Sequence, residues 1–197
     1  MAFPLSSRSD SSPRIAIFAS GAGSNAQKII DHFKKATIAK VALVLSNNLH
    51  AGVLQIAAME NIPAVVIEKK FFYETGYLEM LWEHEIDLIV LAGFLWKVPL
   101  MLIKAYHNKI INIHPALLPK FGGKNMYGQL VHEAVIQSGE KESGITIHYV
   151  DEIYDHGKII FQTTCRVEED DTPQSLAEKI HQLEHTHYPQ VIEKLVS

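Results

Sequence analysis

The chain has 197 residues, 47% of them hydrophobic, and a formal net charge of −4 at pH 7. This length and apolar content suffice for one buried core, whereas the acidic balance argues against a protein that binds nucleic acid through a basic face. Cys165 is the only cysteine, so an intrachain disulfide is excluded and a reducing cytoplasmic location is expected.

The ends of the chain and its most apolar stretch define one predicted domain. Met1–Pro13 is rich in serine and lacks the apolar core of a signal peptide, so we predict a disordered tail and a single domain over residues 14–197. Ile86–Trp96 is too short to cross a bilayer as a helix and contains Asp87 and Gly93. No membrane partner is therefore expected.

Short apolar runs alternate with segments of helical period through the first half of the chain. The predicted elements are a strand at Arg14–Ser20, a glycine turn and a helix through Phe33, a strand at Lys40–Leu45, a helix at Gly52–Glu60, a strand at Pro63–Ile67, a helix at Phe72–Glu85, a strand at Asp87–Ala92, a helix at Pro99–Tyr106 and a strand from Lys109. Strands that are apolar on both faces and alternate with helices indicate a parallel sheet covered by helices.

The second half of the chain departs from this alternation. A helix at Gln129–Ser138 is followed by two β-rich runs, Ile145–Val150 and Ile159–Val167, and by a final helix from Thr172. The two runs are close enough in sequence to pair as a hairpin-like unit. The predicted fold class is therefore α/β, with a mostly parallel central sheet flanked by helices and an antiparallel C-terminal part.

The strand that begins at Lys109 carries two polar side chains, Asn112 and His114, before a loop stiffened by Pro115 and Pro119. Residues two apart on a strand point to the same face. An amide donor beside an imidazole suits chemistry in which negative charge develops on a carbonyl oxygen. Asp155, in the loop between the two late strands, is the candidate carboxylate that would favour the charged form of His114 and fix its tautomer.

The first strand ends in a glycine turn, Gly21-Ala22-Gly23, that opens a helix. A match to the relaxed dinucleotide fingerprint is formal only, because no acidic residue ends the second strand, where Ser46, Asn47 and Asn48 stand. Backbone N–H groups at a helix N-terminus suit a phosphate monoester instead. A turn capped by Ser24 with no ligand at all is the structural alternative.

Four segments together resemble the folate-dependent formyltransferases, namely FASGAGSN at Phe18–Asn25, LAGF at Leu91–Phe94, INIHPALLPK at Ile111–Lys120 and HYVDEIYDHGKIIFQ at His148–Gln162. Within that family the SGxGSN-type loop is similar to the branch that formylates glycinamide ribonucleotide. The resemblance runs from about Arg14 to the C-terminus and implies a Rossmann-like formyltransferase fold.

The resemblance also implies a reaction and its partners. The expected reaction moves the formyl group of 10-formyltetrahydrofolate to the amine of 5-phosphoribosylglycinamide in de novo purine synthesis. Folate is then a co-substrate, no tightly bound cofactor or metal is expected, and the protein is a monomer or a homodimer. His181, His185 and His187 suggest a metal site at first sight, but no second ligand cluster completes it.

Site residues follow from the resemblance position by position. The trio Asn112, His114 and Asp155 matches the catalytic residues of the family. The substrate-binding residues implied are Gly23, Ser24, Asn25, Ala26, Gln27 and Glu184; the folate-binding residues implied are Leu95, Trp96, Lys97, Val98, Asn112, Asp151, Glu152, Ile153, Tyr154 and Asp155.

This chain departs from the family pattern where the acidic tail of folate is expected. Trp96 stands where the family often has arginine, and the segment before the fourth strand offers Glu74 and Thr75 instead of another arginine. The loop at Phe121–Gly128 is also unusual. Lys97, Lys120 and Lys124 are the alternative cations.

Three other interpretations remain open from the sequence. The chain could be an oxidoreductase that holds a dinucleotide at the glycine turn, a formyltransferase that acts on an amino sugar nucleotide, or a binding protein without catalysis.

Overall fold

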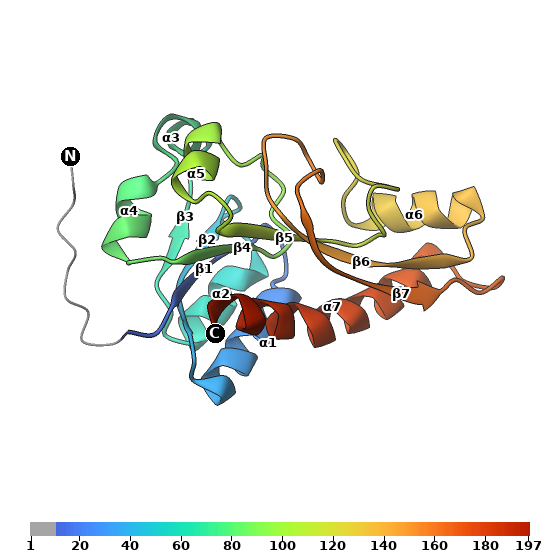
Figure 1. Cartoon of the computed structure of the whole chain (residues 1–197), viewed down its shortest axis with the longest axis horizontal. Coiled ribbons are helices and arrows are strands. Elements are labelled where there is room, and N and C mark those ends of the chain that lie inside the picture. The colour runs from blue at the N-terminus through green and yellow to red at the C-terminus, as the bar shows by residue number, and fades with distance from the viewer. Residues whose placement is uncertain (1–10) are drawn as a thin grey trace.

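The computed structural model describes residues 11–197, so most of the predicted tail lies outside the described residues (Figure 1). One seven-stranded sheet runs through the molecule in the order β3-β2-β1-β4-β5-β6-β7. The first five strands pair in parallel, whereas β5–β6 and β6–β7 pair antiparallel, which confirms the predicted α/β class. The strands are β1 Arg14–Phe18, β2 Lys40–Ser46, β3 Ala64–Val66, β4 Leu88–Leu91, β5 Ile110–His114, β6 Glu142–Tyr149 and β7 Ile159–Arg166.

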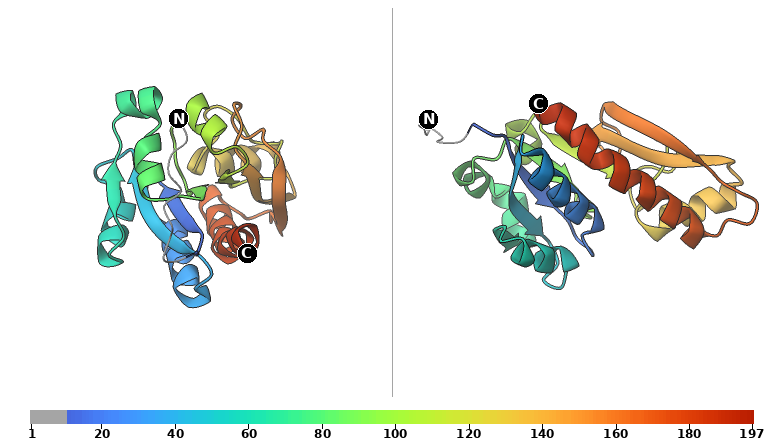
Figure 2. Two further views of the ribbon diagram at one scale, coloured as in Figure 1. Left: turned by 60° about the vertical axis from the view of Figure 1, so that its left-hand side comes forward. Right: turned by 90° about the horizontal axis from the view of Figure 1, so that it is seen from below.

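Helices cover both faces of the sheet (Figure 2). They are α1 Ser24–Ala36, α2 Gly52–Met59, α3 Lys69–Thr75, α4 Leu78–Glu83, α5 Leu100–Ala105, α6 Gln129–Ser138 and α7 Pro173–Val196. Alternation along β1 separates two cores: Ile15 and Ile17 pack with α1, α2 and α7, whereas Ala16 and Phe18 pack with α3, α4 and α5. No helix within residues 11–197 is long and apolar enough to cross a membrane.

The single helix predicted at Phe72–Glu85 is wrong, because the chain forms two helices there. Gly76 ends α3 in the left-handed region at φ 61°, with its N–H donating to the Phe72 carbonyl at 3.1 Å. Tyr77 follows at φ 54° and starts α4 in a new direction. A glycine that ends a helix in this conformation is common, and the apolar period simply continued across it.

Strand β6 lies between β5 and β7 and determines how the later part of the site is built. The long connection through α6 brings β6 back antiparallel to β5, which places Asn112 opposite His148 and His114 opposite Thr146. Helix α7 then packs against α1, and its buried Tyr188 hydroxyl donates to the Leu91 carbonyl at 3.0 Å. The carboxyl end of β4 is thus held by a helix from the far end of the chain.

Candidate active site

A cavity of about 620 Å³ opens at the carboxyl ends of β1, β4 and β5. Its walls are the glycine turn after β1, the loop over residues 91–98, the end of β5, the loop over residues 123–128, the connection over residues 150–155 and one side of α7. The carboxyl edge of a parallel sheet is where α/β proteins usually bind ligands, because the strand ends and the helix N-termini meet there.

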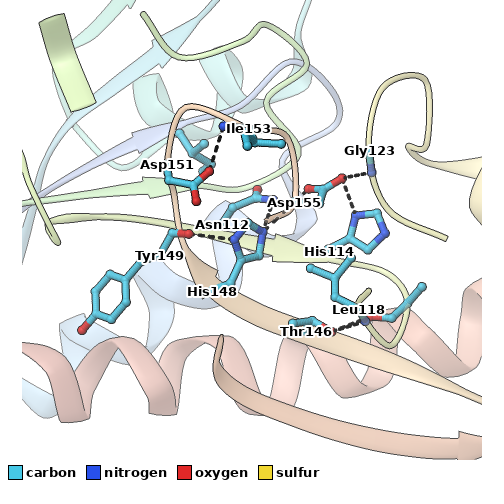
Figure 3. A network of polar contacts seen from close by, with 12 residues as sticks. Asn112, His114, Leu118, Gly123, Thr146, His148, Tyr149, Asp151, Ile153 and Asp155 are labelled. Atoms are coloured by element: carbon cyan, nitrogen blue, oxygen red, sulfur yellow. Dashed lines mark hydrogen bonds and ion pairs between the residues drawn. The ribbon is translucent and has the colours of Figure 1, made fainter. Parts of the chain in front are cut away.

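The three residues predicted as a catalytic trio meet in this cavity (Figure 3). Asn112 and His114 project from the same face of β5, and Asp155 reaches them from the β6–β7 connection. The His114 Nδ1 atom lies 3.6 Å from Asp155 Oδ2. Residues more than 40 positions apart in the chain therefore surround one point, as the sequence predicted.

His148 belongs to the same cluster, and the sequence analysis did not assign it. The Nδ1–H of His148 donates to the Tyr149 carbonyl at 2.8 Å, so its Nε2 carries a lone pair that accepts from the Asn112 amide at 3.2 Å. The same Nε2 lies 3.7 Å from Asp155 Oδ1. One hydrogen bond thus fixes the Asn112 amide with its NH₂ group at His148, and a second N–H of that group remains for a ligand.

The expectation that His114 is charged is opposed by its surroundings. The side chain is buried, and burial lowers the pKa of His114 below its usual value although Asp155 and the Phe121 carbonyl act in the opposite direction. Its Nε2–H donates to the Phe121 carbonyl at 2.7 Å, because a carbonyl can only accept. Neutral His114 therefore presents the Nδ1 lone pair toward Asp155.

Asp155 is held in its charged form by three neighbours. Burial alone would raise the pKa of Asp155, but His148 and His114 in their protonated forms and the Gly123 N–H together outweigh burial and lower it. The Gly123 N–H donates to Oδ2 at 2.9 Å. The loop that differs from the family pattern, Phe121–Gly128, therefore contacts both His114 and Asp155 through its backbone.

At the other end of the cavity stands the glycine turn, with Gly23 in the left-handed region at φ 85°. Added side-chain atoms at Gly23 would meet Val53 at 2.9 Å, so glycine is required there. Asn25 donates from Nδ2 to Glu184 Oε2 at 2.8 Å. Glu184 is 6% exposed, and burial raises its pKa despite the Asn25 hydrogen bond.

Two of the predicted substrate-binding side chains point elsewhere. Gly23, Ser24, Asn25 and Glu184 line the cavity, but Ala26 is fully buried in the core. The side chain of Gln27 donates to Asp31 at 2.9 Å and to Glu60 at 3.3 Å. The helical turn rotates these two side chains away from the helix N-terminus, so the predicted contact of Ala26 and Gln27 with the substrate stays a prediction for their backbone atoms alone.

The predicted folate-binding residues line the cavity with one exception. Leu95, Trp96, Lys97, Val98, Asn112, Asp151, Ile153, Tyr154 and Asp155 all face it. Glu152 does not, because the connection turns there and the Asp151 carboxylate caps the Ile153 N–H at 2.8 Å. The Glu152 side chain is exposed.

The cavity wall also contains residues outside the predicted catalytic, substrate-binding and folate-binding sets. They are residues 123–128, where Lys124 was a candidate cation, His132 on α6, and His181 on α7, which had suggested a metal site. His132 is 3% exposed, and burial with the nearby His181 and His114 lowers its pKa to about 4. Within residues 11–197 no group of three or more His, Cys, Asp or Glu side chains is arranged to hold a metal ion.

Comparisons with known proteins agree with this geometry. Residues 13–192 match the family model described as formyl transferase. A phosphoribosylglycinamide formyltransferase of Bacillus subtilis is 40% identical over 93% of this chain and 94% of its own length. The chloroplastic phosphoribosylglycinamide formyltransferase of Arabidopsis thaliana is 38% identical over 91% of this chain, which spans 64% of that relative.

Solved structures give the same result. The crystal structure of glycinamide ribonucleotide transformylase 1 from Geobacillus kaustophilus superposes with a TM-score of 0.87 at 38% identity, and covers 94% of this chain and all (100%) of its own. A second plant relative, from Vigna unguiculata, is 40% identical, and this chain spans 60% of its length. The match over nearly the whole domain and the shared fold lead to one conclusion: the chain belongs to the formyl transferase family, in the group of the phosphoribosylglycinamide formyltransferases.

Proposed function

We propose that this protein transfers the formyl group of 10-formyltetrahydrofolate to the amine of 5-phosphoribosylglycinamide, which gives formylglycinamide ribonucleotide and tetrahydrofolate in purine synthesis. The observation that carries the proposal is the convergence of Asn112, His114 and Asp155 inside one cavity. The printed names of the relatives support the choice of substrates.

The two ends of the cavity suit two different ligands. Backbone N–H groups at the start of α1, together with Ser24 and Asn25, suit the phosphate of the ribonucleotide. Glu184, held by Asn25, suits the glycinamide portion as a hydrogen-bond acceptor. The loops over residues 91–98 and 150–155 form the opposite end, which suits the folate.

In the proposed reaction the neutral amine attacks the formyl carbon. A C–N bond forms, the carbonyl π electrons move to oxygen, and the unpaired N–H of Asn112 donates to that oxyanion. Removing one donor of this kind typically lowers kcat by about 100- to 1,000-fold. The amide is already oriented by His148, so little reorganisation accompanies the step.

Proton transfer falls to His114. Its Nδ1 lone pair takes the proton from the attacking nitrogen, and the imidazolium that forms is stabilised by Asp155 at 3.6 Å. The tetrahedral intermediate then collapses: the bond to folate N10 breaks, its electrons return to N10, and N10 takes a proton from the imidazolium. Neutral His114 in the free protein fits this role, since a base must begin without the proton.

We also infer that no resident cofactor takes part. The formyl group arrives at the oxidation level of the product, and the substrate brings its own nucleophile. A cytoplasmic location and a monomeric or homodimeric state stay predictions.

The test is an absorbance assay of formyl loss from 10-formyltetrahydrofolate with purified protein. Transfer predicts a signal only when glycinamide ribonucleotide is present, whereas hydrolysis predicts a signal without it. Two controls address the alternatives: titration with a nicotinamide dinucleotide, and competition by an amino sugar nucleotide against glycinamide ribonucleotide. Binding of the dinucleotide, or formylation of the sugar in preference to the ribonucleotide, would contradict the proposal.

A further inference from the structure

The folate end of the cavity has an exposed rim made by two facing loops, residues 91–98 and 150–155. Leu95, Ile153 and Tyr154 on this rim are 51%, 60% and 41% exposed. Lys97 bridges the two loops, because its Nζ lies 5.8 Å from the centroid of the Tyr154 ring. The rim therefore combines an apolar and aromatic surface with an ammonium group.

The acidic groups that line the cavity are held by partners other than Lys97. Asp151 pairs with His156 at 2.8 Å, Asp155 lies between two histidines, and Glu184 accepts from Asn25. Among the ion pairs formed within residues 11–197, none includes Lys97. Its charge is thus available to a ligand that leaves the cavity across the rim.

No arginine within residues 11–197 reaches this rim. Arg14 lies at the amino-terminal end of β1, where its Nε donates to the His84 carbonyl at 2.6 Å. Arg166 lies at the end of β7, 3.4 Å from Glu168. Arg8 is outside the described residues. The usual bidentate partner of a carboxylate is therefore absent from the described part of the cavity.

The other candidate lysines are placed differently. Lys120 lies outside the cavity and pairs with Glu140 at 2.7 Å. Lys124 lines the cavity, but on the Phe121–Gly128 loop, next to the Gly123 N–H that binds Asp155. Only Lys97 combines a position between the two folate loops with contact to an exposed aromatic ring.

We infer that the Lys97 ammonium group binds a carboxylate of the glutamate tail of the folate. This contact would give the protein its preference for the glutamylated co-substrate over one that lacks the tail. The inference rests on the proposed function and names one recognition group within it. A lysine carries a compact, hydrated point charge on a flexible stem, so it can pair with one carboxylate over a range of carboxylate positions. The planar guanidinium of an arginine requires a fixed bidentate geometry instead.

The expected effect is modest because the pair is exposed. Exposed ion pairs contribute about 0.2–1 kcal/mol, so the glutamate tail should raise kcat/KM by about 1.4- to fivefold. Salt screens such a pair, and the advantage should shrink at high ionic strength.

The experiment compares two co-substrates, 10-formyltetrahydrofolate and the primary amide of 10-formyltetrahydropteroate, which lacks the glutamate and its charges. For the wild type, the ratio of the two kcat/KM values should be about 1.4 to five. Lys97→Met should bring the ratio close to one by lowering kcat/KM for the glutamylated form only. Lys97→Arg should restore the preference.

Lys120→Met removes the same charge outside the cavity and should keep the wild-type ratio. The inference is overturned if Lys97→Met keeps that ratio, if both co-substrates lose kcat/KM equally, or if Lys124→Met is the variant that abolishes the preference. Binding of tetrahydrofolate and its tail-less amide, followed by quenching of tryptophan fluorescence, gives the same ratio without turnover. Absence of formyl transfer in the wild type would refute the proposed function, while the binding ratio would still decide the role of Lys97.

Discussion

Replacement of Asp155 by Asn should abolish most of the turnover while leaving the fold in place. The Asn side chain keeps an oxygen that can accept from the Gly123 N–H, now 2.9 Å from Asp155 Oδ2. What disappears is the negative charge that faces His114 Nδ1 at 3.6 Å. The substitution therefore separates charge from shape.

The magnitude follows from that distance. Two unit charges 3.6 Å apart interact by about 4–5 kcal/mol at an effective dielectric constant of about 20. If this interaction is present when His114 is protonated during the reaction and absent in the free protein, its loss raises the barrier by about that amount. Because about 1.4 kcal/mol corresponds to a tenfold change in rate, kcat should fall by about a thousandfold.

The assay measures kcat by absorbance at saturating concentrations of both substrates, and the dissociation constant of tetrahydrofolate by fluorescence. Asp31→Asn is the matched control, because Asp31 lies on α1 outside the cavity, where it accepts from Gln27. Circular dichroism and thermal unfolding report whether each variant is folded. A folded Asp155→Asn protein that keeps kcat within tenfold of the wild type would refute the assigned role of this carboxylate.

Three further predictions follow from the buried polar groups. Burial lowers the pKa of His114, so a plot of kcat/KM against pH should lose activity on the acid side at a pH below the usual histidine pKa. Asp155 raises the pKa of His114, so the residual activity of Asp155→Asn should be lost at a still lower pH. His132 has a pKa of about 4 in the folded protein against about 6.5 unfolded, so it contributes stability above pH 6.5 that is lost as the pH falls toward 4. Chemical unfolding of wild type and His132→Gln at pH 7.5 and pH 4.5 should show a smaller loss for the variant, by about 2–3 kcal/mol, and an equal loss would contradict the assignment. Thr146→Val leaves the buried Leu118 N–H and Ala116 carbonyl without their hydrogen-bond partner and should lower the free energy of unfolding by about 1–3 kcal/mol, measured in urea, whereas the exposed Thr164→Val should change it by less than about 0.5 kcal/mol.

Local rules predicted much of the sheet and the central part of the site. Side-chain alternation on β5 was enough to place Asn112 and His114 on one face, and the strand–helix alternation was enough for the parallel half of the sheet. Asp155 was a candidate partner of His114 from its place in the loop between the two late strands, and the resemblance to the formyltransferases matched it to the catalytic trio. Each of these inferences depends on a short segment or on a motif.

What could not be predicted depends on pairing between distant segments. His148 enters the site because β6 pairs antiparallel with β5 in a register that places it opposite Asn112. The sequence indicated that β6 and β7 pair with each other, but carried no signal for the register between β5 and β6. A shift by one residue would have sent His148 to the other face of the sheet.

The direction of single side chains and a break within a helical period are also hard to predict from short segments. Ala26 and Gln27 follow the glycine turn in sequence, yet the helix that starts there rotates their side chains into the core and toward Glu60. The break at Gly76 was hidden because the apolar period continues on both sides of it. Proximity in sequence predicts proximity of backbone, not the direction of a side chain.

The antiparallel strand also explains how a polar site is kept rigid before a substrate arrives. Asn112, His114 and His148 are each held by a hydrogen bond or ion pair to protein groups, and two of those contacts are backbone carbonyls that cannot change their role. A strand neighbour directly opposite Asn112 fixes the amide more firmly than a loop would, because the β5–β6 ladder sets the spacing of the two residues. The donor to the oxyanion is then in position at the start of the reaction. The free-energy cost of orienting it belongs to folding and does not add to the reaction barrier.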